Sequence, residues 1–285
     1  MSSRRLALLV AAAVTVGTVS TATLVGPASA STGGAPDGEA HPATGLLLVY
    51  ADGARTRCSG TLVSPTVVLS AAHCFDGATG KVGVTFDSVI AEEPADLTIE
   101  PAANTSAGYT AAELAATGLA SGSPVQHPDY SGLEDLDSWN DVAVVLLDEP
   151  VLDIEPAPLA PVGTLDTIAK SRLAKTRFTA VGYGSEVRKP ESGPQKATPE
   201  TFPLLRRTVE MPGQKLTPQV LQTNGNLNKG GEVCVGDSGG PVLLDEAVVA
   251  VTSYNNGSGT KCRSVQGFQR VDVPVVRNWL AEFGL

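Results

Sequence analysis

The stretch Gly236-Asp237-Ser238-Gly239-Gly240-Pro241 places one serine inside a run of glycines, four residues after Cys234. Glycine allows close backbone approach and unusual dihedral angles, so the N–H groups of this run can point at a ligand. A serine hydroxyl is a poor nucleophile unless a base removes its proton. A tight turn would explain the glycines equally well. The stretch therefore predicts a nucleophilic serine only if a matching base and carboxylate exist elsewhere.

The search for the base is short, because the chain has only 3 histidines. His41 and His127 each precede a proline, which biases them toward extended loop conformations. His73 instead follows the apolar run 67–69 and the small residues Ser70-Ala71-Ala72. Small neighbours leave room for a substrate and for a second side chain to approach the imidazole. A histidine beside a strand is usually structural, so it is the glycine-framed serine that makes His73 the candidate base.

Asp141 is the candidate for the acid that orients the base. It stands at the start of the apolar run 142–147, which indicates a buried strand. An aspartate there is costly to bury unpaired, so it needs a donor, and an imidazole N–H is one. Capping of a helix or strand is the alternative role for this residue type. Together with His73 and Ser238, Asp141 completes a candidate catalytic triad.

The order of the three residues separates two kinds of hydrolase. Residues 236–240 also satisfy the G-x-S-x-G pattern of α/β-hydrolases, but those enzymes need their histidine after the serine. No histidine follows Ser238. The order His73, Asp141, Ser238 instead resembles that of the chymotrypsin-like serine proteases.

Four segments carry this resemblance, which covers roughly residues 42–285. Three are similar to the catalytic motifs of the family: Ser70-Ala71-Ala72-His73-Cys74, Asn140-Asp141-Val142-Ala143 and Cys234-Val235-Gly236-Asp237-Ser238-Gly239-Gly240-Pro241. The fourth resembles the segment before its histidine loop: Cys58-Ser59-Gly60-Thr61-Leu62-Val63. Their joint occurrence in order is a specific signal.

The resemblance implies an all-β fold of two packed six-stranded antiparallel β-barrels with a C-terminal helix. The protease domain would be residues 31–285, with barrels at about 42–150 and 165–272 separated by a proline-rich linker. Composition agrees, because 30 glycines and 20 prolines separate short apolar runs. Strands are expected at residues 46–50, 61–63, 66–69, 142–147, 178–182, 205–210, 241–244, 247–254 and 267–273.

The terminal helix is expected over residues 274–283. Pro274 suits a first helical turn. One face collects the apolar side chains Val275, Val276, Trp279, Leu280 and Phe283. The long segment 76–126, by contrast, is expected to contain strands and an inserted surface loop.

The resemblance also assigns roles around the serine. The backbone N–H groups of Gly236 and Ser238 would form the oxyanion hole. Asp237 would pair with a freed N-terminal amine, which in the family usually belongs to Ile or Val. This chain offers Ser31-Thr32-Gly33-Gly34 instead. Either a trimmed polar N-terminus inserts beside Asp237, or Asp237 has another partner.

Four residues are expected to bind the substrate. Glu232 stands six residues before the serine, at the position matching the base of the family's primary specificity pocket. A carboxylate there favours a substrate Arg or Lys, whereas a glutamate turned to solvent would not select. Ser253 and Tyr254 precede Asn255, which stands where the family often carries glycine, so a narrow pocket is expected.

The four cysteines allow three pairings. The resemblance selects Cys58–Cys74, which would tie down the histidine loop, and Cys234–Cys262 beside the serine. A metal site is the alternative use of cysteine, but no Cys-x-x-Cys pair or histidine cluster supports it, and no metal or cofactor is expected.

An acidic loop contains Asp129, Glu134, Asp135 and Asp137. These side chains could bind calcium, but their spacing does not match an EF-hand. A solvated loop is therefore the favoured interpretation.

Residues 1–30 have the form of a signal peptide. Arg4 and Arg5 precede a long apolar stretch, and Ala28 and Ala30 suit signal peptidase. A membrane anchor is the alternative, and the adjacent arginines hint at twin-arginine rather than general secretory export. No later segment is apolar enough to span a bilayer. A net charge of −10 argues against nucleic acid as a partner.

The sequence thus predicts a secreted, monomeric serine endopeptidase that hydrolyses protein or peptide substrates through an acyl-enzyme, with a preference for Arg or Lys. The alternative is a catalytically inactive homologue that acts as a binding module.

Overall fold

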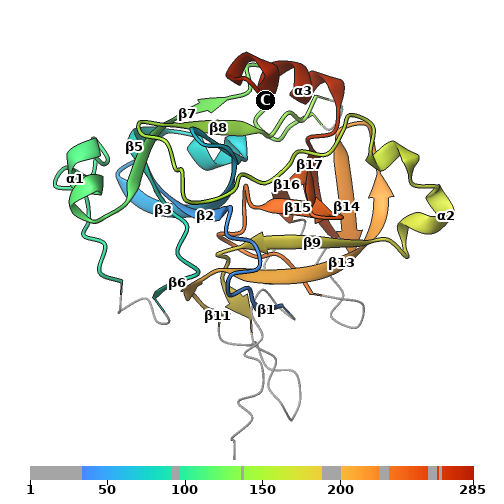
Figure 1. The fold of residues 1–285 in the computed structure, drawn as a ribbon, viewed down its shortest axis with the longest axis horizontal. Coiled ribbons are helices and arrows are strands. Elements are labelled where there is room, and N and C mark those ends of the chain that lie inside the picture. Colours follow the sequence, from blue (N-terminus) through green and yellow to red (C-terminus); the bar gives the residue numbers. More distant parts are fainter. Residues whose placement is uncertain are drawn as a thin grey trace, which may run out of the picture.

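The computed structural model describes residues 34–91, 97–135, 138–187, 200–224, 231–255, 262 and 265–285. The proposed signal peptide lies outside these residues. Two β-barrels lie side by side, and the C-terminal helix α3 (Pro274–Leu280) lies at the top of the view (Figure 1). Among the described residues, no helix has the length and apolar character needed to cross a membrane.

The first barrel closes from six antiparallel strands in the order β2-β3-β4-β8-β7-β5. The strands are β2 (Thr44–Ala51), β3 (Ala54–Ser64), β4 (Val67–Ser70), β5 (Ala78–Thr85), β7 (Ala120–Gln126) and β8 (Ala143–Leu147). Branched and aliphatic side chains such as Leu47, Leu62 and Val145 fill its interior. Their burial provides the main stabilisation of the barrel.

The second barrel runs in the order β13-β14-β17-β16-β15-β9, and β9 pairs back to β13 to close it. The strands are β9 (Arg177–Gly182), β13 (Arg207–Leu216), β14 (Val220–Asn224), β15 (Pro241–Leu244), β16 (Ala247–Asn255) and β17 (Val265–Arg270). A short strand, β1 (Ala35–Pro36), adds to β13. The architecture confirms the predicted fold class.

Short elements complete the described chain. Two strand pairs join β6 (Val89–Ala91) to β12 (Leu204–Leu205) and β10 (Glu186–Val187) to β11 (Glu200–Thr201). The helices besides α3 are η1 (Ala72–Phe75), α1 (Ala111–Ala116), η3 (Leu165–Thr167), α2 (Lys170–Leu173) and η4 (Ala281–Phe283).

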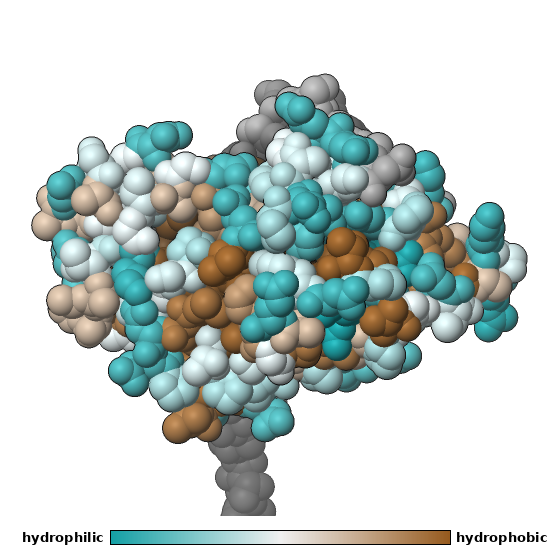
Figure 2. Space-filling view, turned by 90° about the horizontal axis from the view of Figure 1, so that it is seen from above, coloured by the Kyte–Doolittle hydropathy of each residue, from teal (hydrophilic) through white to brown (hydrophobic). Residues whose placement is uncertain are grey.

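The terminal helix packs where the two barrels meet. One hydrophobic cluster contains Val144 from the first barrel, Val251 from the second and Trp279 from α3. The α-helix ends at Leu280, and the 3₁₀ helix η4 follows it directly. The helix expected to reach residue 283 therefore has a 3₁₀ last turn. Polar side chains surround apolar residues near the middle of this end of the molecule (Figure 2).

Val275 departs from the predicted helix face. Its side chain is 37% exposed, whereas Val276 and Leu280 are fully buried. The strand expected to reach residue 273 likewise ends at Arg270. There the chain bends, because Asp272 turns back to accept hydrogen bonds from the Arg270 guanidinium.

A buried ion pair fastens the start of the described chain to the second barrel. Arg206 Nε donates to Asp37 Oδ2 at 2.9 Å, and its other nitrogens donate to the carbonyls of Gly38, Thr44 and Phe86. Burial alone would raise the pKa of Asp37, but bonds from His41 and Arg206 outweigh it and lower that pKa. The guanidinium is therefore paired and hydrogen-bonded, as a buried charge requires.

Candidate active site

His73 and Asp141 meet at the ends of two paired strands. His73 lies in η1, just after β4, and Asp141 lies just before β8. The strands are antiparallel neighbours, with Ser70 opposite Ala143. His73 Nδ1 lies 2.8 Å from Asp141 Oδ2, and the His73 backbone N–H donates to Asp141 Oδ1 at 2.9 Å. Both carboxylate oxygens therefore hold the histidine.

The second barrel also contacts Asp141. Ser253 Oγ donates to Asp141 Oδ2 at 2.5 Å and accepts from Trp139 Nε1 at 2.7 Å. Gln269 Oε1 accepts from the Asp141 backbone N–H at 3.0 Å. The Asp141 side chain has no exposed surface, whereas the His73 side chain is 21% exposed. The acid is thus enclosed while the base faces outward.

The pKa of His73 reflects competing effects. Burial lowers it, but the hydrogen bond and charge of Asp141, together with the charge of Asp76, raise it more. The result is a His73 pKa above the ordinary value of 6.5. This direction is what a carboxylate-oriented imidazole requires, because the imidazolium is stabilised.

Ser238 lies on the second barrel, in the segment before β15. Its carbonyl accepts from the Ser59 backbone N–H at 2.8 Å. Cys58 precedes Ser59 and forms a disulfide with Cys74, the neighbour of His73. A short path of contacts therefore joins the serine backbone to the histidine loop.

The described residues show no hydrogen bond between the Ser238 hydroxyl and the His73 ring. Catalytic hydrogen bonds are often long without substrate and shorten in the substrate complex. The side chains of His73 and Asp141 are thus brought into contact, and Ser238 is brought to the same seam through its backbone.

Gly239 makes this close approach of the two barrels possible. A Cβ at this position would overlap Ser70 Oγ and the Ser59 carbonyl, and its φ of +78° favours glycine. Its N–H donates to the Thr252 carbonyl at 2.8 Å. Any larger residue would push the serine segment away from the first barrel.

Two amides of the serine segment face no acceptor among the described residues: those of Gly236 and Ser238. The intervening Asp237 N–H donates to the Cys234 carbonyl at 3.0 Å. Gly236 has φ +101°, a conformation that side chains disfavour. The N–H groups of Gly236 and Ser238, without acceptors among the described residues, are suited to bind an oxyanion.

Asp237 is a buried acceptor in the same segment. Its Oδ1 accepts from the Gly184 N–H and its Oδ2 from the Cys234 N–H, both at 2.7 Å. These bonds fix the backbone that carries Gly236. Residues 31–33, which the sequence offered as an inserting N-terminus, lie outside the described chain.

The expected substrate-binding residues lie at and near the end of β16 and before the serine. Glu232 is fully buried, which rules out the alternative of a solvent-facing glutamate. Tyr254 Oη accepts from Gln222 Nε2 at 2.8 Å, and its ring meets Trp139 edge to face. Asn255 ends β16 and is exposed. The Ser253 hydroxyl donates to Asp141 and does not face solvent.

Both disulfides implied by the resemblance are present, Cys58–Cys74 and Cys234–Cys262. In the part of the chain that the structure describes, no three His, Cys, Asp or Glu side chains are grouped to hold a metal ion. Of the acidic loop considered for calcium, Asp137 lies outside the described residues.

Two glutamines that were not predicted hold the backbone at Asn140 and Asp141. Gln269 Oε1 accepts from the Asp141 N–H, and Gln219 Oε1 accepts from the Asn140 N–H at 3.1 Å. Gln219 also lines a cavity of about 990 Å³ that contains none of the triad. Gln269 lies inside β17 and Gln219 in the bend before β14, and a polar residue at either place does not reveal its partner from the sequence.

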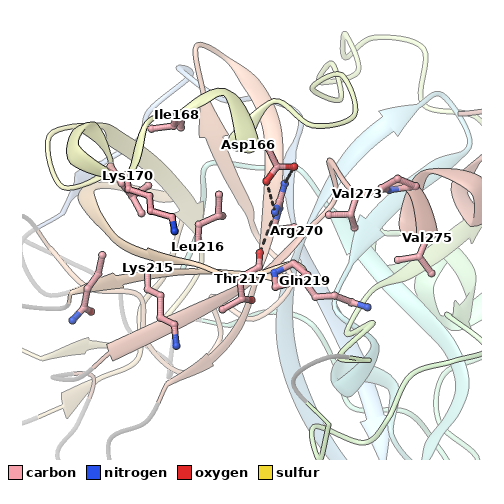
Figure 3. Close-up of a pocket in the computed structure, with 14 residues that line it drawn as sticks. Asp166, Ile168, Lys170, Lys215, Leu216, Thr217, Gln219, Arg270, Val273 and Val275 are labelled. Carbon is pink, nitrogen blue, oxygen red and sulfur yellow. Dashed lines mark hydrogen bonds and ion pairs between the residues drawn. The ribbon is translucent and has the colours of Figure 1, made fainter.

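Figure 3 shows this cavity. Asp166 faces the Arg270 guanidinium, while Lys170 and Lys215 extend on the other side. Arg270 is neutralised by Asp166 and Asp272. Gln219 connects the lining of this cavity to the backbone of Asn140, the residue before Asp141.

Two closed barrels, a buried His73–Asp141 pair and a glycine-framed Ser238 at their seam define the chymotrypsin fold with its site. The family model described as Trypsin matches residues 37–280. The chain therefore belongs to the trypsin family of serine proteases.

Curated relatives of modest sequence identity include a trypsin and a serine protease. The chain is 29% identical to a trypsin of Saccharopolyspora erythraea over 76% of this chain and 82% of that protein. It is 27% identical to brachyurin of Leptuca pugilator over 75% and 82%. Serine protease 56 of Mus musculus is 30% identical over 79% of this chain, but the match spans only 34% of that protein.

Solved structures show the same fold. HL collagenase has a TM-score of 0.60 at 19% identity, over 89% of this chain and 98% of that one. Human heparin binding protein has a TM-score of 0.55 at 19% identity, over 88% and 95%. A scabies mite inactivated protease paralogue has a TM-score of 0.56 at 16% identity, over 88% and 98%.

Proposed function

We propose that this chain is a secreted, monomeric serine endopeptidase. The observation that carries the proposal is the enclosed Asp141, which holds His73 by two hydrogen bonds at the seam where Ser238 is anchored. Such an arrangement serves to move one proton from a hydroxyl to an imidazole. Membership of the trypsin family supports the same reaction class.

The mechanism follows from the positions of the groups. His73 Nε2 takes the proton of Ser238 as its oxygen attacks the peptide carbonyl. Asp141 keeps the Nδ1 proton in place and stabilises the imidazolium. The N–H groups of Gly236 and Ser238 hold the oxyanion, a contribution of about 3 kcal/mol for each donor. His73 then protonates the leaving amine, and water hydrolyses the acyl-enzyme by the same route.

The test of this function is covalent labelling. A fluorophosphonate probe phosphonylates a serine only where a base activates it and a hole holds the oxyanion. We expect one adduct per chain, and peptide mapping should place it on Ser238. A protein that stays unlabelled while circular dichroism shows it folded would contradict the proposal.

A binding module without activity is the second candidate. The observation in its favour is that the described residues show no hydrogen bond between the hydroxyl and the imidazole. The fold alone does not decide, because its structural neighbours include a protease paralogue named as inactivated. We favour the enzyme because all three groups and the two free amides are retained.

The pH dependence of turnover provides an independent check. His73 must be neutral to act as a base, so kcat/KM should rise with pH as the ring loses its proton. Because Asp141 raises the His73 pKa, the midpoint should lie above 6.5. The associated stability has the opposite sign, since a raised pKa stabilises the fold at low pH and this contribution is lost as pH rises through it. A flat profile between about pH 5 and 8 would contradict the assignment of the base.

Secretion is proposed from the signal-like residues 1–30. The two disulfides support it, because such bonds persist in oxidising compartments. Expression of the full chain should release protein into the medium. Its N-terminal sequence should begin near Ser31, and the activity of that material would show whether further trimming is needed.

A further inference from the structure

The side chain of Gln266 forms two hydrogen bonds that cross from one barrel strand to the segment before the catalytic serine. Gln266 lies in β17 and has no exposed surface. Its Oε1 accepts from the Val233 backbone N–H at 3.1 Å, and its Nε2 donates to the Val233 carbonyl at 2.9 Å. The amide therefore satisfies both backbone polar groups of Val233 with its own acceptor and one of its donors.

This crossing lies between the two walls expected to enclose a substrate side chain. On one side, Val233 directly follows Glu232, which matches the base of the primary pocket. On the other side, the end of β16 carries Asn255, which pairs with Gln266 across the sheet. The Gln266 side chain runs from β17, beside the second wall, to Val233 in the first. Its amide therefore lies against the residue that directly follows Glu232.

The surroundings keep the amide in this place. Displacing it would leave the Val233 N–H and carbonyl buried without their partners, which is unfavourable. Backward movement of β17 is also limited, because the ring of Tyr254 lies so close to Gly267 that no Cβ would fit there. Tyr254 is itself held by Gln222. Neither wall can widen the space without breaking these contacts.

We propose that Gln266 is a specificity-determining residue that closes the primary pocket from within. The proposal rests on the proposed function. The residue before the scissile bond would then be small and uncharged, such as Ala, Ser or Val. Glu232 is buried and would then be out of reach of a substrate Arg or Lys in the native protein.

The test is a substrate series that differs in one residue. Peptide anilides ending in Ala, Val, Lys or Arg are compared for the native protein and for Gln266→Gly, which removes the crossing side chain. We expect the native protein to favour Ala and Val over Lys and Arg by at least tenfold in kcat/KM. Gln266→Gly should raise kcat/KM for Lys and Arg at least tenfold and lower it for Ala.

Gln266→Leu is the matched control, because it keeps the bulk and removes both hydrogen bonds. It should continue to reject Lys and Arg. Native preference for Lys or Arg, or an unchanged ratio in Gln266→Gly, would overturn the proposal. Should glycine prevent folding, Gln266→Ser replaces it with the same expectation.

A binding experiment separates failure of this inference from failure of the proposed function. Benzamidine carries a cation on a flat ring and needs an open pocket but no catalysis. In a Ser238→Ala background, calorimetry should detect benzamidine binding at least tenfold more tightly after Gln266→Gly than before it. Equal benzamidine affinity with and without Gln266→Gly would contradict the closed pocket, even if the protein had no hydrolytic activity. Loss of fluorophosphonate labelling, by contrast, concerns only the proposed function.

Discussion

Replacing Ser238 by alanine should lower turnover by about 10⁴-fold or more. In the proposed mechanism the oxygen of this hydroxyl bonds to the substrate carbonyl, so its removal leaves only substrate binding and the oxyanion donors to act. The fold should not change, because the Ser238 carbonyl, not its hydroxyl, bonds to Ser59. Initial rates on a peptide anilide provide the measurement.

The control for this variant is Ser88→Ala. That hydroxyl donates to Glu39 at 2.9 Å and has no role in the triad, so its loss should leave the rate unchanged. Near-native peptidase activity in Ser238→Ala would remove the assignment of the nucleophile. Thermal unfolding curves for both variants should overlay that of the native protein.

Replacing Asp141 by asparagine should lower kcat by a similar factor, about 10⁴, the precedent for this change in a catalytic triad. The structure explains why. Asp141 Oδ1 accepts from the His73 backbone N–H, a donor that cannot reverse, so the asparagine oxygen must take that place. Its NH₂ group then faces His73 Nδ1 and the Ser253 hydroxyl. The imidazole is driven to the tautomer with its proton on Nε2, which cannot accept the proton of Ser238.

Two measurements test this account. The His73 pKa, followed by NMR titration, should fall in Asp141→Asn, because the carboxylate that raises it is gone. Asp148→Asn is the matched control, since Asp148 pairs with Lys81 at the barrel surface and should leave turnover unaltered. Full activity in Asp141→Asn would show that another group orients the base.

The sequence located most strands but often missed their bounds. β3 covers Ala54–Ser64 where residues 61–63 were expected, and β13 covers Arg207–Leu216 where residues 205–210 were expected. The strand β14 (Val220–Asn224) was not predicted. Pro241–Leu244 has the bounds expected for β15, because turn residues flank it on both sides. The segment 76–126 was less predictable, although Thr110 and Glu113 form a capping box that begins α1. That box is visible in the sequence as Thr-x-x-Glu. Val275 was wrongly predicted to lie on the buried face of α3, but it is 37% exposed. Helical periodicity shows which residues share a face but not how much of that face the rest of the protein covers.

The candidate triad could be recognised because its chemistry requires particular residue types in one order. Its supports could not. Gln219 lies just before β14, whereas Gln266 and Gln269 both lie in β17, and all three bond to backbone groups far away in sequence. A glutamine in a strand has no local pattern that names its partner. Pairing across a barrel depends on register, which only the folded structure supplies.

The bonds of Asp141 to Ser253 and Gln269, and of Ser238 to Ser59, all cross from one barrel to the other. Neither barrel alone contains all the groups of the proposed triad. A slight separation of the barrels should therefore abolish the proposed activity while each sheet keeps its hydrogen bonds, so peptidase activity should report on barrel docking more sensitively than circular dichroism of the strands.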